Sequence, residues 1–332
     1  SVDSRRTGIR IGDLGFDLAT QTVAKSRLGF YKDALYSYWD WVAAGLQSGV
    51  TAGLLDLAER RDRDLADAID LGQLAPVERT DNQRAILQRR AALVTARRVV
   101  EATAITLSVF HRGADGRPER PVAARLPNGL PTPAPLTDDE EARAVDEALS
   151  RRPELASLRL KREQQQAELR LANNALLPSL NLFGDYSRDA GSGRVSRQGN
   201  EWSAGLLFEV PLQRRKASGK VGQVTAKLGS LDAELRFAED RVRADVHDAA
   251  SAVRAAYAAV ELVRQELSVA RELEALERDR FLLGDSTQFM VNLRELNTAD
   301  AAFREIKALA DYQKARVALD GATGRLLDRV TP

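Results

Sequence analysis

Two Leu-Gly pairs far apart in the chain each interrupt a long helical pattern that afterwards resumes. The first interruption is Leu-Gly-Gln-Leu at 71–74 and the second is Leu-Gly-Asp-Ser at 283–286, and the resumed runs end at Gly113 and Gly324. Glycine reaches the positive φ that a tight reversal between antiparallel helices needs, so each pair predicts the tip of a helical hairpin. Because the hairpin occurs twice, the chain is interpreted as an internal duplication.

A heptad seam runs through the second half of the chain. From Val221 to Ala270, apolar residues recur at alternating spacings of three and four, with one extra step of four between Val242 and Val246. This spacing predicts a coiled-coil helix that reaches Leu283 and whose left-handed supercoil relaxes at the extra step. Alanines lie off the seam at 226, 233, 244, 250, 252, 255, 258 and 259. They leave room for a second neighbour, which favours a cylinder of helices over a two-stranded rod.

The first half of the chain predicts another long hairpin. Residues 17–70 contain no proline, which allows a helix of about fifty residues, on the order of 80 Å long. The return helix begins near Pro76, since proline is tolerated in a first turn. A proline-rich linker at 117–135 follows, and then Thr137 with Glu140 three positions on forms a capping box that opens a short helix.

A further helix begins near Pro153 and is stopped by Pro178, after which the apolar period changes to two. In the stretch 202–212 every second residue is apolar, with Ser203, Gly205 and Glu209 between them, and 180–186 gives a weaker partner strand across an exposed loop at 189–200. Each strand has about ten residues, the length of a tilted transmembrane β-strand. An alternating strand would equally cover a soluble core. The residues assigned to a lipid-facing side are Trp202, Ala204, Leu206, Phe208 and Val210.

Composition excludes several classes of protein. A net charge of +1 supplies no electrostatic field to recruit nucleic acid, and the lack of cysteine excludes disulfides and thiolate metal sites. No run of eighteen apolar residues exists, so the sequence predicts no transmembrane helix. The only histidines, His111 and His247, have no metal-binding spacing, and no phosphate-binding glycine loop is present. We therefore expect no catalytic residues, no metal site and no cofactor.

The order of these parts resembles the outer membrane efflux protein (TolC) family. The residues that carry the resemblance are Arg-Pro-Glu-Leu at 152–155, Leu-Pro-Ser-Leu at 177–180, Phe-Leu-Leu-Gly at 281–284 and Asp-Tyr at 311–312. The match covers nearly all of residues 151–327 and, more weakly, residues 17–113 as the first repeat.

The resemblance implies a mainly α fold in two repeats. Long antiparallel coiled-coil hairpins would form an α-barrel, and the β-hairpin would contribute to a transmembrane β-barrel shared by a homotrimer, with four strands from each protomer. The protein would lie in the outer membrane with its helices in the periplasm. It would serve as a passive conduit in a tripartite efflux or type I secretion system, together with a periplasmic adaptor protein and an inner-membrane pump.

The resemblance also assigns roles to individual residues. The helical tips would contact the adaptor through Leu71, Gly72, Gln73 and Leu74 in one repeat and Leu283, Gly284, Asp285, Ser286 and Thr287 in the other. The first turns after the tips would line the tunnel entrance, with Glu78, Thr80, Asp81 and Met290 as gate candidates. Met290 stands where the family often has an acidic residue, so the pattern does not predict a complete acidic ring.

The predicted domains are a first repeat at 1–113, a linker with a short helix at 114–152, a second repeat at 153–327 and a tail at 328–332. The first repeat should have its own helix and β-hairpin before residue 17, and we expect that the chain lacks their beginning. Arg6 to Phe16, with three glycines, would be the end of a missing strand. The rival interpretation is a soluble, elongated coiled-coil scaffold, and neither interpretation identifies an exported substrate.

Overall fold

A computed structural model describes residues 3–189 and 199–330. The chain divides into two compact units. The first unit combines Ser1–Val23 with Pro153–Asp240, and the second combines Ala24–Arg152 with Arg241–Pro332. Each unit therefore takes segments from both predicted repeats, because the long helices pass from one unit into the other.

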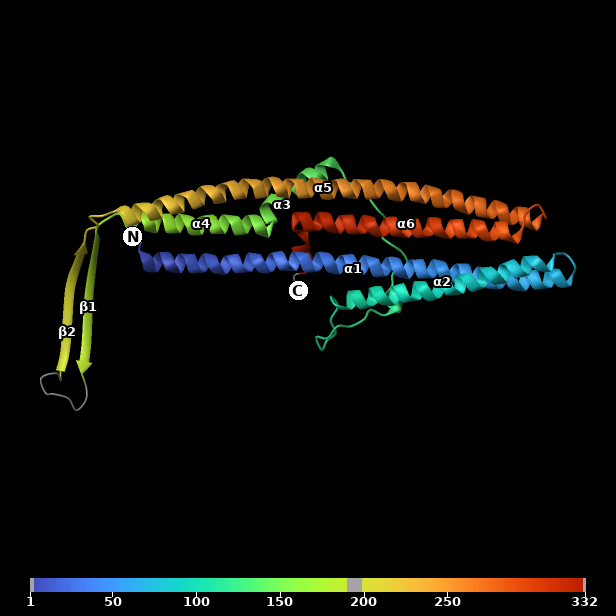
Figure 1. The fold of residues 1–332 in the computed structure, drawn as a ribbon, viewed down its shortest axis with the longest axis horizontal. Coiled ribbons are helices and arrows are strands. Elements are labelled where there is room, and N and C mark those ends of the chain that lie inside the picture. The colour runs from blue at the N-terminus through green and yellow to red at the C-terminus, as the bar shows by residue number, and fades with distance from the viewer. Residues whose placement is uncertain (1–2, 190–198, 331–332) are drawn as a thin grey trace. The chain divides into compact units, whose positions relative to one another are not determined.

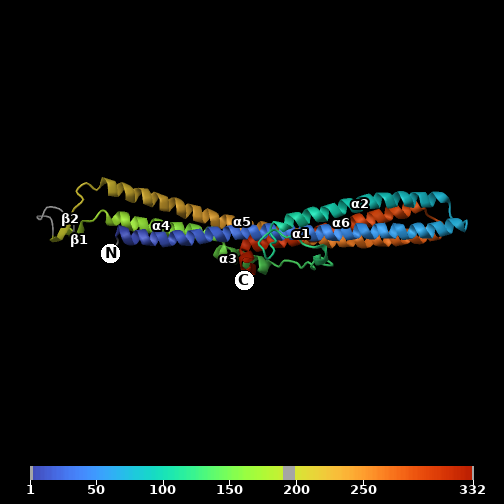
Figure 2. The same ribbon diagram turned by 90° about the horizontal axis from the view of Figure 1, so that it is seen from below.

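Two helical hairpins dominate the structure, as predicted (Figure 1). Helix α1 (Ser4–Asp70) returns as α2 (Pro76–Ser108), and α5 (Arg215–Leu282) returns as α6 (Gln288–Thr323). In the second unit, α2 and α6 lie side by side (Figure 2). The parallel course of these two return helices brings both hairpin tips to the same end of that unit.

Both tips reverse through glycine in the left-handed region, with φ of 72° at Gly72 and 80° at Gly284. At the first tip the N–H of Gly72 donates to Ile69 and that of Gln73 to Ala68, at 2.8 and 2.9 Å. These bonds satisfy carbonyl groups that the helix end would otherwise leave unpaired. The predicted turns are confirmed.

The heptad seam is the buried face of α5. Most of its valines and leucines are buried and the others are half-buried, whereas most of the alanines off the seam are exposed in the protomer. The fully or almost fully buried seam residues are Val224, Leu231, Val242, Val246, Val253, Val260 and Leu267. Spacing alone thus predicted correctly which side of a helix of 68 residues packs within the chain.

The proline-rich linker that follows α2 packs closely on α1 within the second unit. Leu126 lies on Gly45 of α1, where an added Cβ would come within 2.6 Å of the leucine side chain. The predicted short helix is α3 (Asp138–Arg151), and its capping box of Thr137 and Glu140 is present. Glu141 of α3 reaches α5, where it contacts His247 at 2.5 Å.

In the first unit, α4 (Pro153–Asn174) packs on the beginning of α1. Residues 6–16, which we expected to be the end of a missing strand, are helical, and that expectation is wrong. Leu14 is buried there, and the Gln164 amide of α4 donates to the Ile11 carbonyl at 3.2 Å. These tertiary contacts outweigh the low helix propensity of the three glycines.

The predicted β-hairpin consists of β1 (Ser179–Asp189) and β2 (Gly199–Glu209), which pair antiparallel. Leu182 lies opposite Leu206 and Tyr186 opposite Trp202, so these apolar side chains share one face, whereas Phe183 and Leu207 lie on the other. The expected loop at 189–200 falls mostly outside the described residues. No helix within residues 3–189 and 199–330 is both long and apolar enough to cross a membrane.

Candidate docking tips and the polar core between the hairpins

The two tips present apolar side chains to solvent. Leu71 is 72% exposed at the first tip, and Leu283 is 78% exposed at the second. Of the nine residues predicted to contact an adaptor, Leu74 and Ser286 are half-buried. The exposed ones are Leu71, Gly72, Gln73, Leu283, Gly284, Asp285 and Thr287.

The four gate candidates do not form one group in the protomer. Glu78 of α2 accepts a hydrogen bond from the backbone N–H of Gln288 at 2.9 Å, so it caps the beginning of α6. Thr80 bonds back to the carbonyl of Pro76 within its own helix. Asp81 lines a cavity, and Met290 is half-buried in the first turn of α6. The structure therefore joins Glu78 to the second hairpin and leaves the other three apart.

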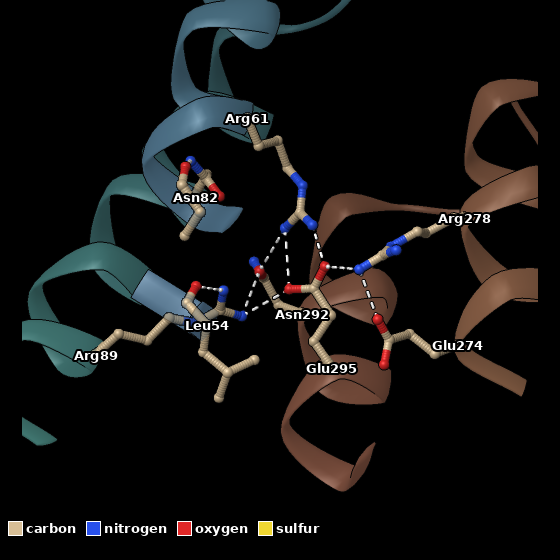
Figure 3. Close-up of polar contacts among 9 residues, drawn as sticks. Leu54, Arg61, Asn82, Arg89, Glu274, Arg278, Asn292 and Glu295 are labelled. Carbon is tan, nitrogen blue, oxygen red and sulfur yellow. Dashed lines mark hydrogen bonds and ion pairs between the residues drawn. The ribbon is translucent and has the colours of Figure 1, made fainter. Parts of the chain in front are cut away.

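Below the tips, all four long helices converge on one buried carboxylate (Figure 3). Glu295 of α6 is completely buried and pairs with Arg61 of α1, Arg89 of α2 and Arg278 of α5. The Arg89 contact measures 2.8 Å and the Arg278 contact 3.2 Å. We define the Glu295 cluster as Arg61, Arg89, Glu274, Arg278, Asn292 and Glu295.

Asn292 and Glu274 complete this cluster. The Asn292 side-chain oxygen accepts from Arg61 at 3.1 Å and from Arg89 at 3.3 Å, one helical turn before Glu295. Glu274 accepts from Arg278 at 2.5 Å (Figure 3). Each buried charge thus has an opposite charge or a polar partner, as burial requires.

Two opposing effects set the charge of Glu295. Burial, the largest effect, raises its pKa, whereas the hydrogen bonds and charges of Arg61 and Arg89 lower it. The net result is a pKa below the ordinary value of a glutamate, so the carboxylate is ionised at neutral pH.

Other polar groups of α2 reach the backbone of α1 nearby. Asn82 donates to the Ala58 carbonyl at 2.9 Å and Arg89 to the Leu54 carbonyl at 2.8 Å. The Asn82 side-chain oxygen and both amide atoms of Gln288 are buried without a hydrogen-bond partner among the described residues. The packing of α2 on α1 is therefore partly polar near the tip, which distinguishes it from the apolar seam of α5.

A groove of about 650 Å³ runs along α2 and α6 beside this cluster. Its walls include Ala85 and Ala92 of α2 and Phe289 and Leu296 of α6, and Asp81 lies among the lining residues. The groove is mainly apolar in its lining. No three His, Asp or Glu side chains in the described ranges gather in a way that would hold a metal ion.

Sequence reasoning missed the Glu295 cluster. A local signal existed, because Glu295 lies four positions from Val291 and from Ala299, which are both buried on the same side of α6. A charged residue within an apolar helical stripe needs a buried partner. Two of the partners, Arg61 and Arg89, lie more than two hundred positions away in α1 and α2, and Arg278 lies across the second hairpin, so no local pattern identifies them.

These features define a class of protein that is built from two long α-helical hairpins, with a β-hairpin between α4 and α5. The sequence profile described as outer membrane efflux protein matches residues 144–325. The chain belongs to this family, and it is an efflux-channel component of the outer membrane. No curated protein sequence matches the chain significantly.

Solved structures of outer-membrane channels share the fold. The open state of MtrE from Neisseria gonorrhoeae superposes with a TM-score of 0.75 at 17% identity, covering 96% of this chain and 71% of that one. VceC from Vibrio cholerae gives 0.72 at 15% identity, with coverage of 96% and 75%. CmeC from Campylobacter jejuni gives 0.69 at 16% identity, with coverage of 96% and 67%. At these identities the likeness concerns the fold alone.

Proposed function

We propose that this protein is the passive conduit of a tripartite export system. Three copies form the channel, a periplasmic adaptor protein contacts the helical tips, and an inner-membrane pump supplies the energy. The observation that carries the proposal is the exposed apolar face of the β-hairpin, placed in sequence between helices that form long hairpins. In a soluble scaffold protein, exposure of that apolar face to water would be unfavourable.

The β-hairpin supports insertion into lipid together with other strands. Leu182, Trp202 and Leu206 are each more than two-thirds exposed and lie on one face. Two strands alone are marginally stable and leave backbone groups unpaired at both edges, which a bilayer does not tolerate. Strands of further copies would pair with these edges.

The helices support the association of several copies. Large apolar side chains on α2 and α5 have no cover in the protomer, and the alanines off the seam of α5 allow close approach of another helix. The exposed side chains are Leu87, Val94, Leu262, Val269 and Leu276. A homotrimer would bury these side chains between protomers.

Opening of the conduit would separate or slide the hairpins at their tips. Nearer the tips than the Glu295 cluster, the first hairpin contacts the beginning of α6 through the hydrogen bond from the Gln288 N–H to Glu78, which can break while the buried cluster keeps the hairpins in register. Docking of an adaptor would shift the balance between packed and splayed tips. Transport through such a conduit needs no catalytic step.

The test is extraction of the full-length protein from the outer-membrane fraction in detergent, followed by mass determination and planar-bilayer recording. We expect a trimer that conducts ions. A water-soluble protein without conductance would refute the channel and favour the scaffold. Photocrosslinking at Leu283, which is exposed at the second tip, separately tests whether an adaptor contacts the tips.

A further inference from the structure

The α5–α6 tip contains a buried carboxylate that the channel function does not explain. Glu277 lies in the last turns of α5, which ends at Leu282, and its side chain is 5% exposed. Its Oε1 accepts a hydrogen bond from the hydroxyl of Ser286, within the tip loop, at 2.5 Å. Its Oε2 lies 3.5 Å from the guanidinium of Arg294 on α6. One carboxylate thus joins the outgoing helix, the loop and the return helix.

The residues that follow Gly284 are fixed from several directions. Ser286 donates to Glu277, Thr287 caps α6 by accepting from the Met290 N–H, and the N–H of Gln288 donates to Glu78 of α2. On the outgoing side, the Arg280 guanidinium donates to the Asp285 carbonyl at 3.1 Å. The loop has little freedom, although its apolar residue Leu283 is exposed.

The α1–α2 tip lacks such bonds. Its turn is held by backbone hydrogen bonds of Gly72 and Gln73, and no side-chain hydrogen bond to residues 71–75 occurs in the described part of the chain. The nearest ionic contact, between Arg79 and Asp62, joins the helix bodies below the loop and is partly exposed. The two tips share their glycine turn and differ in the support beneath it.

We propose that Glu277 is a positioning residue that holds the α5–α6 tip in one conformation, so that this tip is the preformed contact for the periplasmic adaptor. The inference rests on the docking role proposed above. A preordered loop loses less conformational entropy on association, so it binds more tightly than a flexible loop with the same surface. The α1–α2 tip would adapt to a partner already bound.

The charge of Glu277 is consistent with this role. The Ser286 hydrogen bond is the main cause that lowers the pKa of Glu277 below the ordinary value, with further lowering by Arg280 and Arg294. The carboxylate is therefore ionised at neutral pH, and a hydroxyl hydrogen bond to an ionised acceptor is stronger than one to a neutral group.

The first experiment measures the order of the loop without a partner. Ser286→Ala removes the loop contact and keeps the contact of Glu277 with Arg294. In the trimer in detergent, we expect hydrogen exchange of the Gly284 and Asp285 amides to accelerate about tenfold. This factor corresponds to the free energy that is lost with a hydrogen bond to a charged group. The matched control is Ser268→Ala, an exposed serine of α5 outside the tip and outside the Glu295 cluster, which should leave this exchange unchanged. Unchanged exchange in Ser286→Ala would overturn the inference and leave the proposed function intact.

The second experiment connects loop order with docking. A photoreactive residue replaces Leu283 or Leu71 in cells that contain the complete export system, and the adduct is identified by mass spectrometry. We expect Ser286→Ala to reduce the yield severalfold at position 283 and to leave the yield at position 71 above half of the unmutated value. An unchanged yield at position 283 despite faster exchange would overturn the positioning role. A conducting trimer that forms no adduct at either position would instead refute the proposed docking of a partner at the tips.

Discussion

At the scale of residues, Glu295 is the group on which the arrangement of the four helices most depends. A buried charge stabilises a fold only where its partners offset the cost of removing it from water. Glu295 receives Arg61, Arg89 and Arg278 from three different helices, so any shift of one hairpin against the other leaves a buried charge unpaired. We infer that the cluster fixes the register of the hairpins more than it adds to the free energy of unfolding.

Replacing this carboxylate should therefore be costly. Glu295→Ala leaves the almost completely buried Arg89 without its anion, and we expect a loss of about 3–5 kcal/mol in the free energy of unfolding. The measurement is denaturant unfolding of the detergent-solubilised protein. Glu59→Gln is the control, because its pair with Arg90 is exposed and is worth at most about 1 kcal/mol. Equal losses in both variants would contradict the central role of Glu295.

The same carboxylate predicts an acid-sensitive component of stability. Since the pKa of Glu295 is lower in the folded chain than in the unfolded one, its contribution is complete above the ordinary value of about 4.5. The contribution is lost as the pH falls through the lower folded value. We expect the melting temperature of the unmutated protein to fall more steeply below about pH 4.5 than that of Glu295→Gln, measured at matched ionic strength. Parallel curves would show that other carboxylates govern acid unfolding.

At the scale of elements, local chemistry predicted most of the fold. The glycine turns, the capping box of Thr137 and Glu140 and the alternating strands are each determined by neighbours a few positions apart, and all three are confirmed. The prediction of a strand end at 6–16 was wrong because the helix there depends on packing against α4, which the glycine content does not reveal. Tip positions were predictable for the same local reason, whereas Glu277 and Glu295 acquire their partners through tertiary packing.

Replacing a tip glycine by alanine should lower the stability of the protein, whereas replacing a glycine within a helix should raise it. Gly284→Ala places a Cβ at a φ of 80°, which should destabilise the hairpin by about 1–2 kcal/mol. Gly53→Ala, within α1 and with no atom within 4 Å of the added Cβ, should stabilise by up to about 1 kcal/mol. Thermal unfolding of both variants in the same detergent measures the difference. A stabilising Gly284→Ala would mean that the turn does not keep its left-handed glycine.

At the scale of the whole molecule, the protomer exposes apolar surface of two kinds. The face of the β-hairpin with Leu182 and Leu206 suits lipid, and the exposed stripe of α5 with Leu262 and Val269 suits another helix. Soluble monomeric proteins rarely expose large contiguous apolar surfaces such as these to water. We therefore propose that assembly and membrane insertion belong to one process, because strand pairing between copies would remove the sheet edges while helix packing would cover the stripes.

The β-hairpin offers a matched pair of substitutions that tests this coupling. Leu206→Arg places a charge on the apolar face, where lipid exposure should cost about 2–4 kcal/mol near the bilayer midplane. Ser203→Arg places the same charge on the opposite face of the same strand, paired with Asp185. We expect Leu206→Arg to reduce both trimer yield and recovery from the outer-membrane fraction, and Ser203→Arg to retain both within about twofold. Because the two changes share residue type and strand, a general effect of arginine on folding would lower both yields together. A lower recovery of Leu206→Arg alone would support a lipid-facing side at Leu206, and equal recovery of the two variants would show that this face lies in water.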